Sequence, residues 1–198
     1  MKQKFSEIID AAGNGDVETV SRLIKEGADI NGRDRFGVTP LIAASFNGKK
    51  DAVRFLIKNG SDLNASTNHG ETALIFSAAR GYQNIVELLV ESGADLHAAT
   101  NRTYPIGGKT PLHFAADSNH LSICEFLVAR GAPPDAKDDE GGTALMSAAF
   151  MGNRKIVRFL IQAGAIVGLQ NTNGQTAADL AFQNGQYVIV NELAGKRN

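Results

Sequence analysis

Hydrophobic residues recur along this chain in short clusters that have the length of small helices. In the segment 84–92, the residues Ile85, Val86, Leu88, Leu89 and Val90 put apolar side chains on more than one face of a helix. A helix with so wide an apolar surface must be sandwiched between neighbouring elements. A cluster rich in small residues precedes each such segment. The pattern predicts helix pairs at 39–47 with 49–58, 72–80 with 82–91, 110–118 with 120–129, and 143–151 with 153–162.

The clusters follow one period. Glycines are 33, 33, 38 and 33 residues apart at positions 27, 60, 93, 131 and 164. Threonines at 39, 72, 110, 143 and 176 keep the same steps. A second glycine series at 15, 48, 81, 152 and 185 shares this register, and Asn119 fills its missing slot. Repetition at this length is typical of stacked helical units. The one irregularity is a five-residue insertion between Gly93 and Thr110, visible in the segment 101–108.

Each unit has residues suited to start and stop its helices. Threonine caps a helix N-terminus, and the proline that follows Thr39 and Thr110 is tolerated in the first turn. The glycines that follow the first helix permit a left-handed residue that ends it. Asparagine is the next best residue for that conformation, so Asn119 is a mild departure.

The repeated motifs resemble those of the ankyrin-repeat family. The chain has a TPLH start at 110–113 and variants of it at the other threonines, and the endings "EGADIN" (26–31), "NGSDLN" (59–64) and "SGADLH" (92–97). The resemblance implies an all-α ankyrin-repeat solenoid, in which stacked helix-turn-helix units carry protruding turns. We expect a single domain over 1–198. Its repeats are 1–33 (N-cap), 34–66, 67–99, 100–137 with the five-residue insertion, 138–170 and 171–198 (C-cap).

The first and last units differ from the others as end caps should. The first lacks the TPLH start, and we expect Phe5, Ile8 and Ile9 to point inward. The last has Ala178 where the other units place leucine, and it ends in Gly-Lys-Arg-Asn. End units of a repeat array need one polar face to stay soluble. Because the chain starts with Met and has two caps, we expect a complete, free-standing protein.

Composition limits the classes of partner. The 198 residues include 20 basic and 21 acidic residues, a net charge of −1, which gives no electrostatic reason to expect nucleic acid or an anionic membrane. No apolar run approaches the roughly 18 residues of a membrane span, and the N-terminus lacks the apolar core of a secretory signal. One cysteine, Cys124, cannot form an internal disulfide, which favours a reducing setting. We expect a cytoplasmic monomer.

Residues that might carry chemistry have structural explanations. His113 holds the family's TPLH position, where the resemblance implies a hydrogen bond between a turn and the neighbouring repeat. His120 and Cys124 have metal-ligand spacing, but a third ligand is lacking and Cys124 aligns with buried valines of sister repeats. The acidic run 138–140 lacks calcium-loop spacing and fits a solvated turn. We therefore expect no enzyme activity, cofactor or metal.

Positions that vary from repeat to repeat are not required by the repeated fold, so their side chains can form a binding surface. Two tracks qualify, the turn before each threonine and the end of each first helix, and the resemblance implies that both line a concave groove. The candidate partner-binding residues are Phe36, Phe46, Arg80, Tyr104, Phe150 and Met151. Their large side chains either anchor a partner or only cover neighbouring side chains. The inserted segment with Tyr104 is either a contact patch or a length variation.

The predicted function is therefore protein–protein interaction through the concave groove and turn tips. The turns change from basic (Arg33, Arg35) to acidic (138–140), which either orients a partner of mixed charge or has no function. Alternatives are a regulatory protein that binds a non-protein ligand, and a scaffold modified by an enzyme. Asn31 and Asn64, each eight residues after a leucine, resemble targets of an asparaginyl hydroxylase, although structural hydrogen bonding also explains them. A consensus scaffold without a partner would have more uniform repeats.

Overall fold

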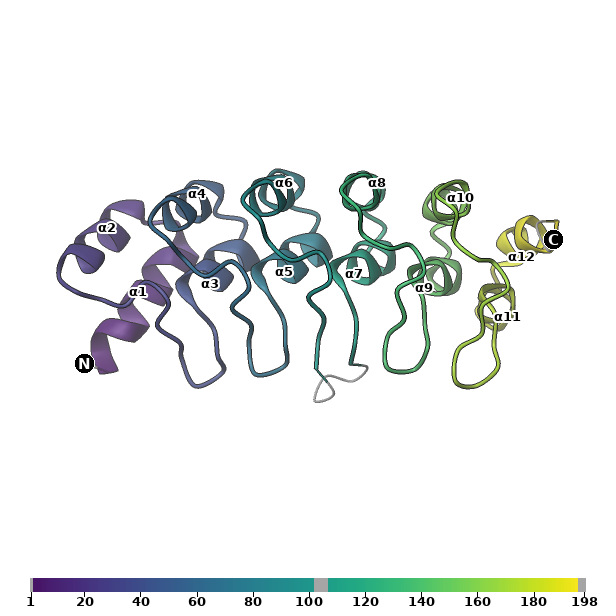
Figure 1. Ribbon diagram of the computed structural model, residues 1–198, viewed down its shortest axis with the longest axis horizontal. Helices are drawn as coiled ribbons and strands as arrows, with labels where there is room; N and C mark the ends of the chain where they lie inside the picture. Colours follow the sequence, from purple (N-terminus) through teal and green to yellow (C-terminus); the bar gives the residue numbers. More distant parts are fainter. Residues whose placement is uncertain (1, 102–106, 196–198) are drawn as a thin grey trace.

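The structure is a computed structural model that describes residues 2–101 and 107–195, and the side chains from residue 6 onward. The described residues form twelve helices in six consecutive pairs (Figure 1). The helices are α1 (Lys2–Asn14), α2 (Val17–Lys25), α3 (Pro40–Phe46), α4 (Lys50–Lys58), α5 (Ala73–Arg80), α6 (Gln83–Glu91), α7 (Pro111–Asp117), α8 (Leu121–Ala129), α9 (Ala144–Met151), α10 (Arg154–Gln162), α11 (Ala177–Gln183) and α12 (Tyr187–Ala194).

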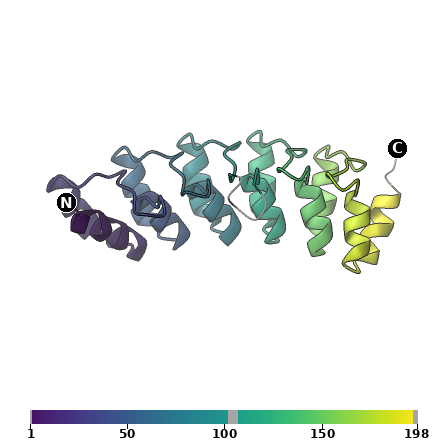
Figure 2. The same ribbon diagram turned by 90° about the horizontal axis from the view of Figure 1, so that it is seen from below.

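The pairs stack side by side into an elongated array with the two termini at opposite ends (Figures 1 and 2). We call the odd-numbered helices inner and the even-numbered helices outer. In Figure 1 the outer helices α4, α6, α8 and α10 are seen nearly end-on at the top, the inner helices lie below them, and the connecting turns extend downward. The part of the chain that the structure describes contains one isolated β-bridge, Ser66 to Thr72, and no strand. The predicted all-helical solenoid is confirmed, and the eight interior helices begin and end within one residue of their predicted bounds.

The threonines and glycines bound the inner helices as predicted. The side-chain oxygens of Thr39, Thr72, Thr143 and Thr176 each accept a hydrogen bond from the backbone N–H three residues on. Each cap satisfies a donor that the first helical turn leaves free. Asn119 has a φ of 63°, the one positive φ of a non-glycine residue in the described chain. It therefore performs the helix-ending role that glycine performs in the other units.

The core is one continuous layer between inner and outer helices along the array. Leu56, Leu89, Leu127 and Leu160 occupy one repeated slot of the outer helices and are fully buried. Cys124 is also fully buried, in line with the valines at its equivalent positions. In the first unit, Ile8 and Ala12 of α1 are fully buried and Ile9 is nearly so, as predicted, whereas the Phe5 side chain lies outside the described residues.

We call the turns before the N-cap threonines tips. A backbone hydrogen bond closes each tip, for example from the Asp34 N–H to the Val38 carbonyl at 3.0 Å. Another joins it to the next tip. The joining bonds are Asn68 N to Phe36 O (2.8 Å), Asn101 N to His69 O (2.9 Å), Asp139 N to Gly107 O (2.9 Å) and Thr172 N to Glu140 O (2.8 Å). The residues that flank the insertion thus keep the bonding of the other tips, while residues 102–106 lie outside the described chain.

The last unit departs from the others at the slot through which inner helices stack. This slot is the seventh residue counted from each N-cap threonine, and it holds Ser45, Ala78, Ala116 and Ala149, all fully buried. In the last unit the slot holds Phe182, which is 61% exposed and packs edge-on against Tyr187 with ring centroids 5.8 Å apart. A further inner helix could not pack there as the others do without displacing this ring.

Candidate interaction surface

The predicted binding residues lie on two parts of the array. Phe36 is on the tip before α3, Phe46 ends α3, Arg80 ends α5, and Phe150 and Met151 end α9. The four apolar residues are 56%, 37%, 41% and 52% exposed, in the order Phe36, Phe46, Phe150 and Met151, and Arg80 is also exposed. Tyr104 lies outside the described residues. The variable positions chosen from the sequence are therefore at the surface wherever the structure describes them.

The first part is an aromatic cluster of Phe46, Phe76 and Arg80, contributed by α3 and α5. The rings of Phe46 and Phe76 meet edge to face with centroids 5.1 Å apart. The Arg80 guanidinium carbon lies 3.6 Å from the Phe46 ring centroid, within the range of a cation–π contact. On the tip before α3, Arg35 stacks in the same way over Phe36, at 4.6 Å. This end of the surface therefore combines positive charge with aromatic rings.

The second part is a hollow of about 430 Å³ between α9, α11 and the tips that precede them. Phe150, Met151, Met146 and Leu180 supply its apolar lining. Its polar lining residues are Lys109, Asp117, Asp138, Glu140, Ser147, Asn171, Asn173 and Gln175. Three of these side chains are carboxylates and one is cationic. The hollow is thus an apolar surface with an acidic border.

A shielded ion pair lies at the side of this hollow. The Lys109 ammonium donates to the Asp117 carboxylate at 2.9 Å, and the two side chains are only 16% and 26% exposed. The pair joins the tip before α7 to the last residue of that helix. Lys109 is therefore neutralised locally, which leaves Asp138 and Glu140 as the unbalanced charges of the hollow.

The two carboxylates differ in what they already bind. One oxygen of Asp138 accepts hydrogen bonds from the backbone N–H groups of Glu140 (3.0 Å) and Gly142 (2.7 Å), which shapes the tip as the predicted solvated turn. The exposed Glu140 carboxylate accepts no hydrogen bond from any described residue. Glu140 is therefore the acidic side chain that remains available to a partner.

The histidine predicted to join neighbouring repeats does so. His113 is fully buried, its Nδ1 lies 2.9 Å from the Thr110 hydroxyl, and its Nε2 lies 3.2 Å from the Gly142 carbonyl of the next unit. Burial lowers the pKa of His113, so the neutral ring is favoured. Both ring nitrogens are occupied in holding the fold together.

The burial or hydrogen bonding of the other residues considered for chemistry also indicates a structural role. Burial raises the pKa of the Cys124 thiol to about 12, so the thiol is protonated and unreactive at neutral pH. The side-chain oxygens of Asn31 and Asn64 accept hydrogen bonds from the backbone N–H groups of Asp62 (2.8 Å) and Asp95 (2.9 Å) in the next unit. No group of three potential metal ligands occurs within 2–101 and 107–195.

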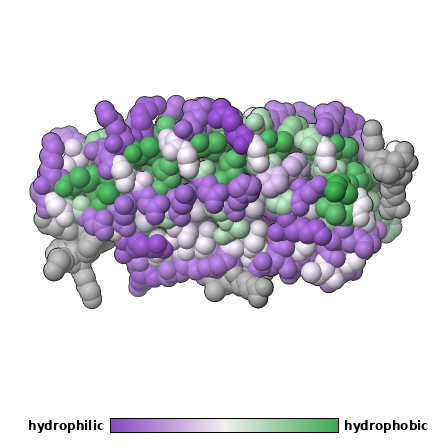
Figure 3. All heavy atoms as spheres, viewed as in Figure 1, coloured by the Kyte–Doolittle hydropathy of each residue, from purple (hydrophilic) through white to green (hydrophobic). Residues whose placement is uncertain are grey.

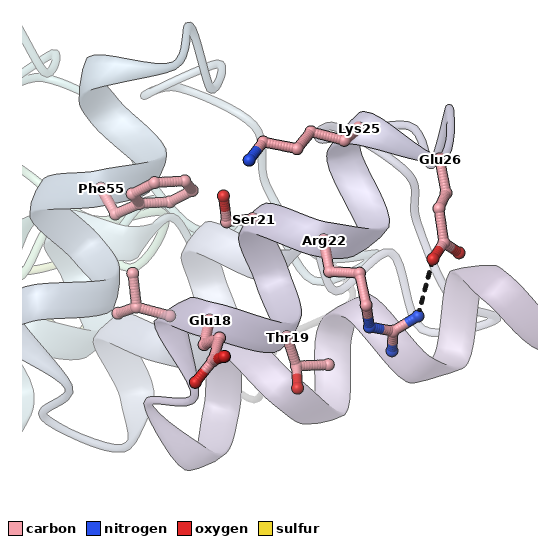
Figure 4. A pocket seen from close by; sticks show the side chains of 8 residues that line it. Glu18, Thr19, Ser21, Arg22, Lys25, Glu26 and Phe55 are labelled. Carbon is pink, nitrogen blue, oxygen red and sulfur yellow. Dashed lines mark hydrogen bonds and ion pairs between the residues drawn. The ribbon is translucent and has the colours of Figure 1, made fainter.

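A second hollow, of about 770 Å³, lies on the outer side between α2 and α4 (Figure 4). Glu18, Ser21 and Lys25 of α2 face Phe55 of α4, and Arg22 of α2 pairs with Glu26 at 2.9 Å. Figure 4 shows Lys25 and Glu18 on either side of the region of Phe55, whereas Arg22 and Glu26 point away from this ring. This hollow lacks the clustered apolar anchors of the α9–α11 hollow, so it ranks below it as a binding surface.

The sequence analysis missed an apolar group in the last unit. Phe182, Tyr187 and Val188 are all more than half exposed, and Ile166 is exposed in the preceding unit. In the same orientation as Figure 1, Figure 3 shows a band of hydrophobic residues at the level of the helices, with hydrophilic residues along the upper edge and over the tips below. Alignment of the repeats would have revealed Phe182, because it interrupts a series of serine and alanine. Val188 likewise stands where the other units have polar residues.

No helix in the described chain is long and apolar enough to cross a membrane.

Comparison with known proteins points to a single family. The family model "Ankyrin repeats (3 copies)" matches residues 8–100 and 112–198, and the model "Ankyrin repeats (many copies)" matches residues 78–128. Together these matches cover most of the chain.

Individual relatives are similar over shorter stretches. The chain is 45% identical over 76 residues to the mouse "Ankyrin repeat and SAM domain-containing protein 6", which is 38% of this chain and 9% of that protein. It is 43% identical over 76 residues to the Caenorhabditis elegans "Transient receptor potential cation channel subfamily A member 1 homolog", 38% of this chain and 6% of that protein. It is 39% identical over 87 residues to an ankyrin repeat-containing protein of Treponema pallidum (strain Nichols), 43% of this chain and 29% of that protein. The chain thus spans less than a third of the length of each of these relatives. The two family-model matches and the stacked helix pairs show that the chain belongs to the ankyrin-repeat family.

Proposed function

We propose that this protein recognises a protein partner through the surface formed by the ends of the inner helices and the tips, which we call the groove. Ankyrin repeats are generally protein–protein interaction modules. The observation that carries the proposal is the position of Phe46, Phe150 and Met151. These large apolar side chains are exposed at the inner-helix ends, where the fold does not need them, and such side chains are common interface anchors.

The groove binds as a rigid surface. Its side chains stand on short helices whose ends are capped and whose tips are joined by hydrogen bonds. Little conformational freedom is then lost from this side on docking, so more of the contact energy is expressed as affinity. We further propose that the protein acts as a monomer, in the cytoplasm, without catalysing a reaction. The buried, protonated Cys124 and the structural role of His113 support the last point.

The experiment compares the wild-type protein with the paired variant Phe46→Ala, Phe150→Ala. Proteins captured from the source organism's lysate are identified by mass spectrometry, and the affinity of the purified partner is then measured by calorimetry. We expect the pair to weaken binding by more than about tenfold, because truncation of an interface anchor costs about 2 kcal/mol or more. Circular dichroism must show that the variant remains folded.

Lys58→Ala is the control, because Lys58 is an exposed residue at the end of the outer helix α4. It should change neither binding nor folding measurably. If the paired variant binds the partner as tightly as the wild type does, the groove is not the binding site. The outer hollow between α2 and α4 then becomes the surface to test.

A further inference from the structure

The groove has two chemically different ends, and both hold a charged group without a partner of opposite sign. At the aromatic cluster, the Arg80 guanidinium lies over the Phe46 ring and donates no hydrogen bond to any described residue. A guanidinium stacked on a ring keeps its N–H groups free at the edge, where they match the two oxygens of a carboxylate. The stacking therefore pre-orients Arg80 to bind an acidic side chain.

The α9–α11 hollow presents the opposite chemistry. Lys109 is neutralised by Asp117 at 2.9 Å, so the remaining carboxylates of the lining, those of Asp138 and Glu140, make the hollow acidic. Phe150 and Met151 supply exposed apolar surface beside them. A lysine or arginine fits this combination well, because its aliphatic stem covers apolar surface while its charged end reaches the carboxylates.

The spacing between the two ends restricts the partner further. Arg80 ends α5, and the hollow begins at α9, two inner helices along the array. Packed helices lie about 8–10 Å apart, so the two ends are about 16–20 Å apart. An extended chain advances about 3.3 Å per residue and a helix about 1.5 Å. The gap corresponds to about five or six extended residues, or to about 11–13 helical ones.

From this arrangement we infer that the groove binds a protein segment with charges of opposite sign at its two ends. An acidic side chain of the segment pairs with Arg80 over the aromatic cluster. A basic side chain with an apolar neighbour enters the α9–α11 hollow beside Glu140. The inference rests on the proposed function and adds the chemistry of the bound segment and the place of each of its charges along the groove. It excludes segments that carry only one sign of charge.

The test selects binders from a library of random 16-residue peptides displayed on phage, with the wild-type protein as bait. A peptide of this length spans the gap in either conformation. We expect the enriched peptides to share an acidic residue and, at a constant distance from it, a lysine or arginine beside an apolar residue. Absence of enriched peptides, or enrichment without this charge pattern, overturns the inference.

The best peptide is then synthesised with a fluorophore and its Kd is measured by anisotropy. Arg80→Glu and Glu140→Lys should each weaken binding by at least about tenfold at low salt, and by less at high salt because mobile ions screen exposed charges. Lys58→Glu on α4 and Glu125→Lys on α8 make the same charge changes on outer helices. These controls should alter the Kd by less than about twofold. Equal effects of groove and control variants contradict the inference.

The double variant Arg80→Glu, Glu140→Arg provides a sharper test. It exchanges the charges of the two ends, so a new selection should enrich peptides with the opposite order of charges. The paired variant Phe46→Ala, Phe150→Ala separates the two hypotheses. If it loses the peptide while the charge variants keep it, the groove binds but the proposed charge pattern is wrong. If it keeps the peptide, the groove itself is wrong.

Discussion

The interior units and the last unit share one frame but use the same stacking slot differently. In the interior units the slot holds serine or alanine, and the next inner helix covers it completely. In the last unit it holds Phe182, which is mostly exposed. The third residue after the N-cap threonine also differs, because it is the exposed Asp179 in the last unit and a buried isoleucine, histidine or methionine in the interior units. Asp179 instead accepts hydrogen bonds from the backbone N–H and the hydroxyl of its own N-cap, Thr176.

The difference illustrates how much of the burial in this protein depends on contacts between neighbouring units. The same slot is fully buried in the interior units and 61% exposed in the last unit. In a repeat array, stability is approximately the sum of each unit's own stability and its nearest-neighbour contacts. The loss in free energy of unfolding on truncating a side chain should therefore depend less on the size of that side chain than on whether a neighbouring unit packs against it. Matched substitutions in two units can measure this difference.

The largest difference should appear between Leu89 and Phe182. Leu89 is fully buried in α6, and Leu89→Ala should lower the free energy of unfolding by roughly 2–5 kcal/mol. Phe182→Ala removes more atoms, but from an exposed site where the ring packs edge-on against Tyr187, so it should cost about 1 kcal/mol or less. Urea denaturation of both variants provides the measurement. A loss below about 0.5 kcal/mol for Leu89→Ala would contradict the packing argument.

Gly81 and Gly185 form the second matched pair, because both follow an inner helix with left-handed φ, 77° and 73°. Alanine in this conformation costs about 1–2 kcal/mol at either site. At Gly81 the added Cβ would also lie 2.5 Å from the His120 ring, which is held by a hydrogen bond to the Ala79 carbonyl. At Gly185 nothing lies within 4 Å. We expect Gly81→Ala to be the more destabilising by about 1–3 kcal/mol in thermal unfolding, and equal losses would show that the ring gives way.

A smaller effect concerns the ion pairs that attach α12 to α10. Glu192 accepts a hydrogen bond from Arg154 Nε at 2.6 Å and also pairs with Arg158. The hydrogen bonds from Arg154 and then Arg158 lower the pKa of Glu192 from 4.5 to about 2. Because the folded-state pKa is lowered, this stabilisation is full above about pH 4.5 and is lost as the pH falls toward 2.

Glu192→Gln should therefore lower the free energy of unfolding at pH 7 by about 0.5–1 kcal/mol, as expected for exposed pairs. The gap between variant and wild type should narrow as the pH falls from 4.5 to 2. Urea denaturation across this pH range provides the measurement. A gap for Glu192→Gln that stays constant with pH would assign the effect to packing.

The smallest effect should come from deletion of residues 102–106. The flanking residues Asn101 and Gly107 already make the tip-to-tip hydrogen bonds seen at the other tips, so the interfaces of the fourth unit do not need the inserted residues. We expect the melting temperature to change by less than about 2 °C. An unfolded deletion variant would show that the insertion is part of the fold.

The periodic features of the fold were predictable because each occurs five or six times along the sequence. The threonine caps, the glycine stops and the buried leucine slot repeat at a fixed spacing, so errors in one unit are corrected by the others. Phe182 was missed because it occurs once, at a slot that holds serine or alanine in the other units, so only a comparison of the units slot by slot reveals it. Val188 was missed in the same way, as one apolar residue in an otherwise polar series.

The candidate surface was only partly predictable. The sequence identified Phe46, Arg80, Phe150 and Met151 as variable positions, but not that Arg80 lies over the Phe46 ring. That contact joins side chains 34 positions apart, and its geometry depends on how two helices lie against each other. The ion pair between Lys109 and Asp117 similarly depends on the angle between a tip and its helix. Contacts that depend on how two elements are oriented leave no repeating pattern in the sequence, so the sequence alone does not predict them.

The hydrogen-bonded tips have a consequence for the pitch of the array. Each tip contributes two chain segments, and hydrogen-bonded segments lie about 4.8 Å apart, so one unit advances the tips by about 9.6 Å. Packed helices advance by about 8–10 Å. The two advances per unit agree, so the row of tips and the row of helices can extend in parallel over many units without one falling behind the other. Under the proposed function, the contacts of a partner that binds along the groove should therefore recur about every 10 Å, once for each unit.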